Sequence, residues 1–250
     1  MGIRPIAMIA AALALGASAP ALAQDGSKPS KEIIAAVADP ARPAADVARD
    51  GERKPAQIVA FAGVKPGDRV AELAPGGGYF TRILARAVGP KGKVYAVVSK
   101  GFAAREGAMD RLKATLAPYP NVEIVVADYT ALTLPEPVDL VWTSENYHDF
   151  HNGPTANVAA LNAAMFKLLK KGGRYYIEDH AAPGTGVTAT ATLHRIDPAA
   201  VRSEVTAAGF RMEADSTLLA NKDDPHTAKV DDPAIKGHTD KFAMRFRKPR

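Results

Sequence analysis

The chain contains no cysteine among its 250 residues and has a single tryptophan. Without cysteine the protein can have no disulfide, no thiolate nucleophile, no iron–sulfur cluster and no Cys-ligated zinc site. A strong excess of one charge is also missing, because 32 basic side chains stand against 27 acidic ones, giving a net charge of +5. Such a modest charge does not by itself indicate a nucleic-acid-binding protein. The remaining composition, 47% hydrophobic and 24% charged, is typical of a globular protein with a full core.

The first 23 residues have the pattern of a cleavable secretory signal peptide. Arg4 supplies the positive start, an apolar run extends from Ile6 to Leu15, and Ala21-Leu22-Ala23 is a small-x-small cleavage site before Gln24. A transmembrane anchor is the alternative, but a span needs about 20 apolar residues and Pro20 interrupts this one. We therefore expect a periplasmic or secreted protein, cut after Ala23, with no stable membrane anchor.

The rest of the chain divides into a short N-terminal segment and one long domain. Residues 24–54 begin as a polar linker and continue as short helices broken by proline, which we interpret as a helical lid segment. In residues 55–250, apolar strands alternate with amphipathic helices, and this alternation predicts a mainly parallel sheet with helices on both faces. The predicted strands are Arg69–Leu73, Lys93–Val98, Val122–Val126, Val138–Trp142, Arg174–Glu178, Phe210–Ala214 and Phe242–Phe246.

The C-terminal third carries a well-marked helix, a long loop and a basic tail. Asp197 can cap a helix over Pro198–Ala208, and Pro198 suits its first position. Residues 217–241 are polar and contain proline, so they predict a long loop between the last two strands. The basic residues after position 240 are typical of an exposed edge strand. An RNA-methylating enzyme would use such a tail for phosphates, but export leads us to expect no nucleic-acid partner.

The most informative segment is the glycine-rich turn Gly76-Gly77-Gly78. The strand before it carries the carboxylate of Glu72 near its end, and an amphipathic helix follows from Phe80. A turn of small residues lets a ligand approach the backbone, and a helix N-terminus offers unpaired N–H groups to an anion. A dinucleotide site would require a glycine where Thr81 stands. The carboxylate instead fits a ligand with a positive amine as well as an anionic group.

The segment Val70 to Thr81 resembles the first motif of class I S-adenosylmethionine-dependent methyltransferases, strand–acid–x–Gly–x–Gly–x–Gly. The resemblance covers Asp50 to Arg250, and the runs Arg49–Pro55 and Lys241–Pro249 resemble an exported branch of that family. It implies a Rossmann-like, seven-stranded α/β sheet, mostly parallel with the last strand antiparallel. It also implies S-adenosyl-L-methionine as the cofactor and methyl transfer to a small-molecule acceptor.

The resemblance further implies a cofactor site around the glycine turn. Gly76–Gly78 would approach the methionine part, Glu72 would hold its ammonium group, and Asp128 would meet the adenine amino group. Ala74 stands where the family has its first glycine, which is tolerable where the backbone keeps a negative φ. The family also has an acidic residue that binds the ribose hydroxyls, expected here at position 98 or 99. Neither Val98 nor Ser99 is acidic, and Ser99 can offer a single hydrogen bond. This missing acid favours an alternative, a non-catalytic protein that binds a nucleoside or metabolite on the same fold.

Candidate catalytic residues follow the strand that ends near Trp142. His148, oriented by Asp149, is our predicted general base, because histidine can remove a proton from a neutral acceptor near pH 7. Asn146, at the border of the cofactor site, and Tyr147 would position the acceptor. The alternative is purely structural, with Asp149 capping a turn and His148 hydrogen-bonded in the core.

A metal site is a third interpretation of the same region. His148, Asp149, Asp179 and His180 offer nitrogen and oxygen ligands, and His194 follows further along the chain. They come from separate loops without HExxH spacing, so the sequence predicts no metal. It also gives no indication of the oligomeric state.

Overall fold

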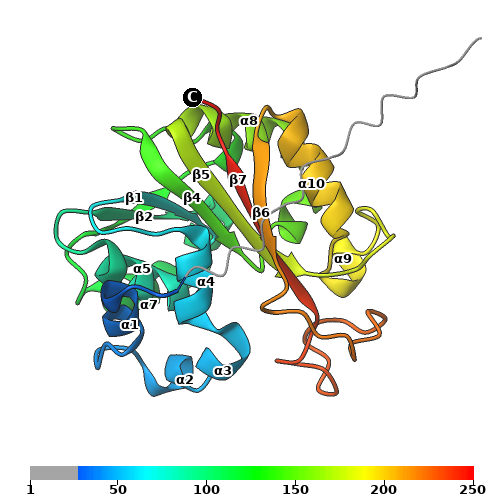
Figure 1. The fold of residues 1–250 in the computed structure, drawn as a ribbon, viewed down its shortest axis with the longest axis horizontal. Helices are drawn as coiled ribbons and strands as arrows, with labels where there is room; N and C mark the ends of the chain where they lie inside the picture. The colour runs from blue at the N-terminus through cyan, green and yellow to red at the C-terminus, as the bar shows by residue number, and fades with distance from the viewer. Residues whose placement is uncertain (1–27) are drawn as a thin grey trace, which may run out of the picture.

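The computed structural model describes residues 28–250, so the predicted signal peptide lies outside the described residues. A seven-stranded sheet in the order β3-β2-β1-β4-β5-β7-β6 forms the centre of the molecule (Figure 1). Strands β1 to β5 pair in parallel, whereas β7 is antiparallel to both β5 and β6. The predicted fold class is therefore confirmed, including the reversed last strand. The strands are β1 (Arg69–Leu73), β2 (Lys93–Val98), β3 (Val122–Val126), β4 (Val138–Ser144), β5 (Leu169–His180), β6 (Arg211–Ser216) and β7 (Lys241–Arg247).

Helices cover both faces of this sheet. On one face α1, α4 and α5 share a core with Val70, and on the other face α8 and α10 share a core with Ala71. Successive residues of β1 thus point to opposite faces, as the strand geometry requires. The helices are α1 (Lys31–Val37), α2 (Ala44–Val47), α3 (Asp50–Arg53), α4 (Pro55–Ala62), α5 (Tyr79–Val88), α6 (Lys100–Ala103), α7 (Ala108–Leu116), α8 (Val158–Leu168), α9 (Thr190–Leu193) and α10 (Pro198–Ala207), with 3-10 turns at Tyr129–Ala131 and His148–His151. None of these described helices is long and apolar enough to cross a membrane.

The N-terminal segment lies against α5 and the glycine turn. Pro40 and Pro43 separate α1 from α2, as proline predicts, whereas α2 and α3 are separated by Ala48 and Arg49. Arg42 forms a bidentate ion pair with Asp50, and the Tyr79 hydroxyl of α5 donates to the same carboxylate over 2.6 Å. These contacts fix α3 above the start of α5.

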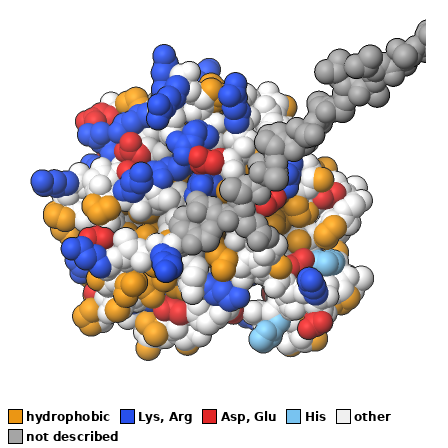
Figure 2. Space-filling view, viewed as in Figure 1, with side chains coloured by type: hydrophobic (Ala, Val, Ile, Leu, Met, Phe, Trp, Pro, Cys, Tyr) orange, Lys and Arg blue, Asp and Glu red, His pale blue; other side chains and the backbone are white. Residues whose placement is uncertain are grey.

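Two sequence expectations near the C-terminus change in the structure. Strand β7 is not an edge, because it lies between β5 and β6, and Arg245 and Arg247 both bind Glu213 on β6. Strand β5 begins at Leu169, before the predicted start at Arg174, and its first residues lie opposite an irregular register in β4. Figure 2 shows basic side chains gathered over the end of the sheet where β7 finishes. That end is opposite the carboxyl ends of the parallel strands.

Candidate functional site

Two adjoining cavities open at the carboxyl ends of the parallel strands. The larger has a volume of about 740 Å³ and the smaller of about 190 Å³, and they share Ala74, Pro75, Gly76 and Asn146 in their linings. Open α/β sheets bind ligands at this edge, in the crevice where the strand order reverses. Here the order reverses between β1 and β4, the two strands that precede Ala74 and Asn146. The topology therefore places the glycine turn and the residues after β4 around one hollow.

The glycine turn borders this hollow without filling it. Gly76 lines both cavities and Gly77 lines the smaller one. A Cβ atom at either position would meet no atom within 4 Å, so the space beside the backbone is open. Gly78 has a different role, because a Cβ there would lie 3.1 Å from Nη1 of Arg82. With φ of 81°, Gly78 allows the left-handed turn that starts α5.

Ala74 adopts a backbone conformation that the sequence analysis did not anticipate. Its φ is +50°, in the left-handed region, so the condition of a negative φ is not met. This conformation costs a non-glycine residue roughly 1–2 kcal/mol. Hydrogen bonds hold it there: the Ala74 N–H donates to the Val97 carbonyl over 2.9 Å, and the Asn146 amide donates to the Ala74 carbonyl over 3.1 Å.

Glu72 lies on the floor of the smaller cavity. The residue is 3% exposed, and its Oε2 atom has no hydrogen-bond partner among the described residues. Burial raises the pKa of Glu72 to about 7, against the opposing effects of Thr81, Arg82 and Arg53. A buried polar atom without a partner costs free energy, so a ligand cation at this position would be favoured.

Positive charge borders the same cavity on the side of the N-terminal segment. Arg53 and Arg49 of this segment both line it. The Arg53 guanidinium lies 4.6 Å from the Tyr79 ring centre and donates to Oε2 of Glu145 over 2.6 Å. Arg53 and Lys241 outweigh the effect of burial and hold the pKa of Glu145 well below its usual range. The smaller cavity thus presents a carboxylate on one side and guanidinium groups on another.

The larger cavity contains the two residues assigned to the nucleoside. Asp128 lines it and caps the 3-10 turn that follows β3, with Oδ1 accepting from the Thr130 N–H over 2.9 Å. Ser99 also lines it, and its hydroxyl oxygen caps α6 by accepting from the Phe102 N–H over 3.0 Å. No carboxylate stands at the end of β2, as the sequence indicated.

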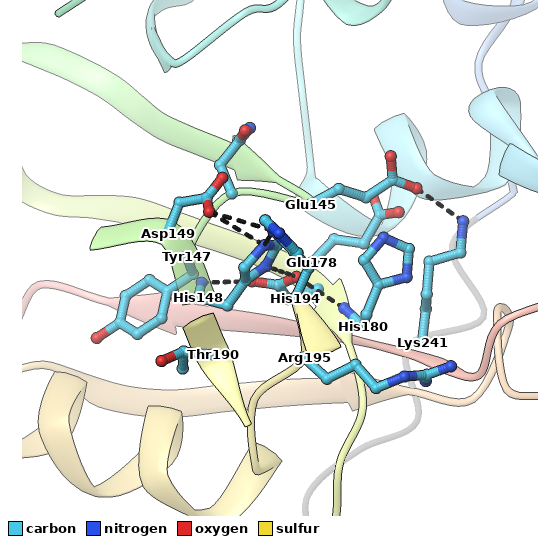
Figure 3. Close-up of polar contacts among 12 residues, drawn as sticks. Glu145, Tyr147, His148, Asp149, Glu178, His180, Thr190, His194, Arg195 and Lys241 are labelled. Carbon is cyan, nitrogen blue, oxygen red and sulfur yellow. Dashed lines mark hydrogen bonds and ion pairs between the residues drawn. The ribbon is translucent and has the colours of Figure 1, made fainter. Parts of the chain in front are cut away.

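Two of the candidate catalytic side chains, His148 and Asp149, meet His194 beside the larger cavity (Figure 3). His148 Nε2 lies 3.3 Å from His194 Nδ1 and 3.4 Å from Asp149 Oδ1. Asp149 and His194 line the cavity, whereas His148 is 2% exposed and lies behind them. Although burial lowers it, the Asp179 carboxylate raises the pKa of His148 above its usual value. The raised pKa makes His148 a stronger base, and its two neighbours Asp149 and His194 stand at the cavity wall.

The structure also places two predicted residues differently and adds two. Tyr147 is fully buried, and its hydroxyl contacts Glu204 and Asn162 rather than the cavity. The carboxylate that binds His148 Nδ1 is Asp179, at 2.7 Å, whereas Asp149 is near the other ring nitrogen. His194 completes the cluster from after α9. In the sequence, Asp179 follows a predicted strand and His194 precedes a capped helix. Neither position shows how far these residues lie from His148.

The chain is similar in sequence to known methyltransferases. Residues 70–173 match the family model of a methyltransferase domain. The chain is 33% identical over 130 residues to a protein-L-isoaspartate O-methyltransferase of Ignicoccus hospitalis, covering 52% of this chain and 55% of that protein. It is 31% identical over 132 residues to a ubiquinone/menaquinone biosynthesis C-methyltransferase of Ectopseudomonas mendocina, covering 52% and 49%. The chain thus spans about half the length of the curated relatives it matches.

Solved structures show the same fold over most of the chain. A SAM-dependent methyltransferase from Aquifex aeolicus superposes with a TM-score of 0.56 at 17% identity, covering 79% of this chain and 89% of that one. The N-methyltransferase NodS from Bradyrhizobium japonicum superposes with a TM-score of 0.54 at 12% identity, covering 82% and 96%. The match over residues 70–173 and the shared fold thus make the chain similar to S-adenosylmethionine-dependent methyltransferases.

Proposed function

We propose that this protein transfers the methyl group of S-adenosylmethionine to a small-molecule acceptor. The observation that carries the proposal is the buried Glu72 carboxylate, which lines the smaller cavity with Gly76 and Gly77 and has an oxygen without a hydrogen-bond partner among the described residues. A zwitterionic amino-acid ligand supplies the ammonium group that this oxygen lacks. The residues present therefore fit the methionine part of the cofactor.

The two cavities suit the two halves of the cofactor. The ammonium group would pair with Glu72, and the carboxylate would meet Arg53 or Arg49, so the N-terminal segment would cover the methionine part. The adenosine part would occupy the larger cavity, where Asp128 has Oδ2 available for the adenine amino group, since Thr130 contacts Oδ1. Ser99 would bind the ribose more weakly than a carboxylate, because its hydrogen bond is not charge-assisted.

The remaining part of the larger cavity would hold the acceptor. At about 740 Å³ it is within the size range of small-molecule sites, and its far side is lined by Asn152, Thr155, Asp149 and His194. The bound cofactor supplies an electrophilic methyl group. This chain's own residues orient the acceptor for in-line attack, and the His148, Asp149 and His194 cluster assists the loss of its proton.

Calorimetric titration with S-adenosylhomocysteine tests the proposal. We expect one equivalent to bind the purified protein, because the demethylated cofactor keeps both the ammonium group and the adenosine that the cavities fit. Adenosine and methionine, titrated separately, serve as controls and should each bind far more weakly. Tight binding of another nucleoside, with none of S-adenosylhomocysteine, would instead support the non-catalytic alternative that the missing ribose acid suggests.

We also propose that the protein is exported, with residues 1–23 removed in transit. The support is the sequence pattern of Arg4, the apolar run and the cleavage site at Ala23. Cell fractionation followed by N-terminal sequencing should find the chain outside the cytosol, beginning at Gln24. A full-length chain found in the cytosol alone would contradict export and leave the methyltransferase proposal standing.

A further inference from the structure

We propose that His148, Asp149 and His194 bind one zinc ion whose fourth coordination position opens into the larger cavity. The three candidate ligand atoms, His148 Nε2, Asp149 Oδ1 and His194 Nδ1, form a nearly equilateral triangle. Its edges measure 3.3 Å between the two histidines, 3.4 Å from His148 to Asp149, and 3.5 Å from His194 to Asp149. The described residues contain this one group whose ligand atoms converge closely enough to hold an ion.

The size of the triangle matches a tetrahedral ion. Zinc binds histidine nitrogen and carboxylate oxygen at about 2.0–2.2 Å, and tetrahedral bonds of that length separate neighbouring ligand atoms by about 3.4 Å. An octahedral magnesium ion, with bonds of about 2.0–2.1 Å at right angles, would need atoms about 2.9 Å apart. Two imidazoles and one carboxylate are also the donor types that zinc prefers over magnesium or calcium. Three protein ligands with one open position are typical of catalytic zinc sites.

The orientation of His148 provides a second, independent observation. Its Nδ1 atom lies 2.7 Å from Oδ1 of the fully buried Asp179, so in the neutral imidazole Nδ1 carries the proton and Nε2 presents a lone pair to the triangle. Asp179 is itself held by the backbone N–H groups of His148 and His180, both at 2.7 Å. A carboxylate behind a metal-binding histidine fixes the tautomer and increases the basicity of the ligand atom.

The His194 ring, which lies against the His148 ring, is carried by an unusual backbone conformation. His194 has φ of 54° and ψ of 47°, a left-handed conformation that is strained for histidine. The next residue, Arg195, is fully buried and binds Asp224 through two hydrogen bonds of 2.8 and 3.2 Å. The loop that carries Asp224 therefore holds this strained turn in place.

The position of the site suggests how the ion would act, a consequence that depends on the proposed function. Asp149 and His194 line the larger cavity and His148 lies behind them, so the open position faces the space assigned to the acceptor. An acceptor hydroxyl or thiol bound there would have a lowered pKa and would release its proton to water. Its lone pair would then form the new bond to the methyl carbon, while the broken carbon–sulfur bond leaves its electron pair on sulfur.

Metal titration of the purified protein, prepared without a histidine tag, tests the site. We expect one equivalent of Zn²⁺ to bind by calorimetry, and one equivalent of Co²⁺ to give the intense visible absorption of a tetrahedral site. His194→Asn removes a ligand but tolerates the left-handed backbone, and we expect it to weaken Zn²⁺ binding at least 100-fold. Asp179→Asn should weaken it about 10- to 100-fold. The matched control is His238→Ala, which removes an exposed histidine and should leave binding unchanged.

The outcomes separate this proposal from the proposed function. Zn²⁺ affinity that is equal in the unaltered protein, His194→Asn and Asp149→Asn would overturn the metal site, even if S-adenosylhomocysteine binds. Zinc binding without S-adenosylhomocysteine binding would support the site and contradict the proposed function. A Co²⁺ spectrum of the weak, octahedral type would overturn the tetrahedral assignment.

Discussion

Replacing Glu72 with glutamine is expected to weaken binding of S-adenosylhomocysteine about ten- to hundredfold while making the unliganded protein more stable at pH 8. The loss of affinity follows because a hydrogen bond to a charged group contributes about 1.5–3 kcal/mol and each 1.4 kcal/mol is about tenfold. The gain in stability follows because Glu72 is buried and its pKa is raised from 4.5 to about 7. A buried charge that is paired only when ligand binds is costly while the site is empty.

The pH dependence of the Glu72→Gln effect has a definite sign. Because the folded-state pKa of Glu72 is raised, its contribution to stability is present below pH 4.5 and is lost as the pH rises through about 7. We expect the glutamine variant to be roughly 1–3 kcal/mol more stable than the unaltered protein at pH 8. At pH 5, where Glu72 is protonated, the two should differ little. Urea unfolding at both pH values measures this difference.

The same titration affects ligand binding. Affinity for S-adenosylhomocysteine should fall by up to about tenfold per pH unit below pH 7, since the ammonium group needs an ionised Glu72. The glutamine variant should lose this slope. The control is Glu123→Gln. Glu123 lies on β3, is half-exposed and pairs with Lys93 of β2, so this substitution should change neither the affinity for S-adenosylhomocysteine nor its pH dependence. Equal affinity of the Glu72 variant and the unaltered protein would remove the basis for the cofactor assignment.

Replacing Asp224 with alanine is expected to destabilise the protein by about 3–5 kcal/mol. Asp224 and Arg195 form an ion pair in which both side chains are fully buried, and removing one partner leaves an unpaired buried charge. Asp224 also accepts hydrogen bonds from the backbone N–H groups of Asp240 and His226, at 2.6 and 2.9 Å. The substitution therefore loosens the long loop between β6 and β7 as well.

Denaturant unfolding of Asp224→Ala measures this effect, and Asp215→Ala provides its control. Asp215 pairs with Arg202, but both side chains are about 40% exposed, at 39% and 42%. Removing an exposed pair of this kind should cost no more than about 1 kcal/mol. A similar loss of stability in the two variants would contradict the prediction, because it would mean that breaking a buried ion pair costs no more than breaking an exposed one.

Local patterns were sufficient to predict most of the elements. Strands β1, β2 and β3 begin and end at the predicted residues, because each is a short apolar run bounded by turn residues. The capped helix α10 begins at Pro198, with Asp197 accepting from the Ala199 N–H as expected. Where the predictions failed, as in the position of β7 within the sheet, the decisive information was which strand lies beside which. Pairing between distant segments leaves no local periodicity to read.

The candidate site illustrates the same division. The glycine turn and Glu72 lie close together in the sequence, and Asp128 follows another strand of the parallel set, so the sequence by itself determined that they would lie at one edge of the sheet. The partnership of His148 with Asp179 and His194 joins residues 31 and 46 positions apart. Only the tertiary structure decided it, because β4 and β5 pair side by side and a buried ion pair fixes the turn after α9. Distances of 3 to 4 Å between such residues depend on packing, which a linear pattern does not encode.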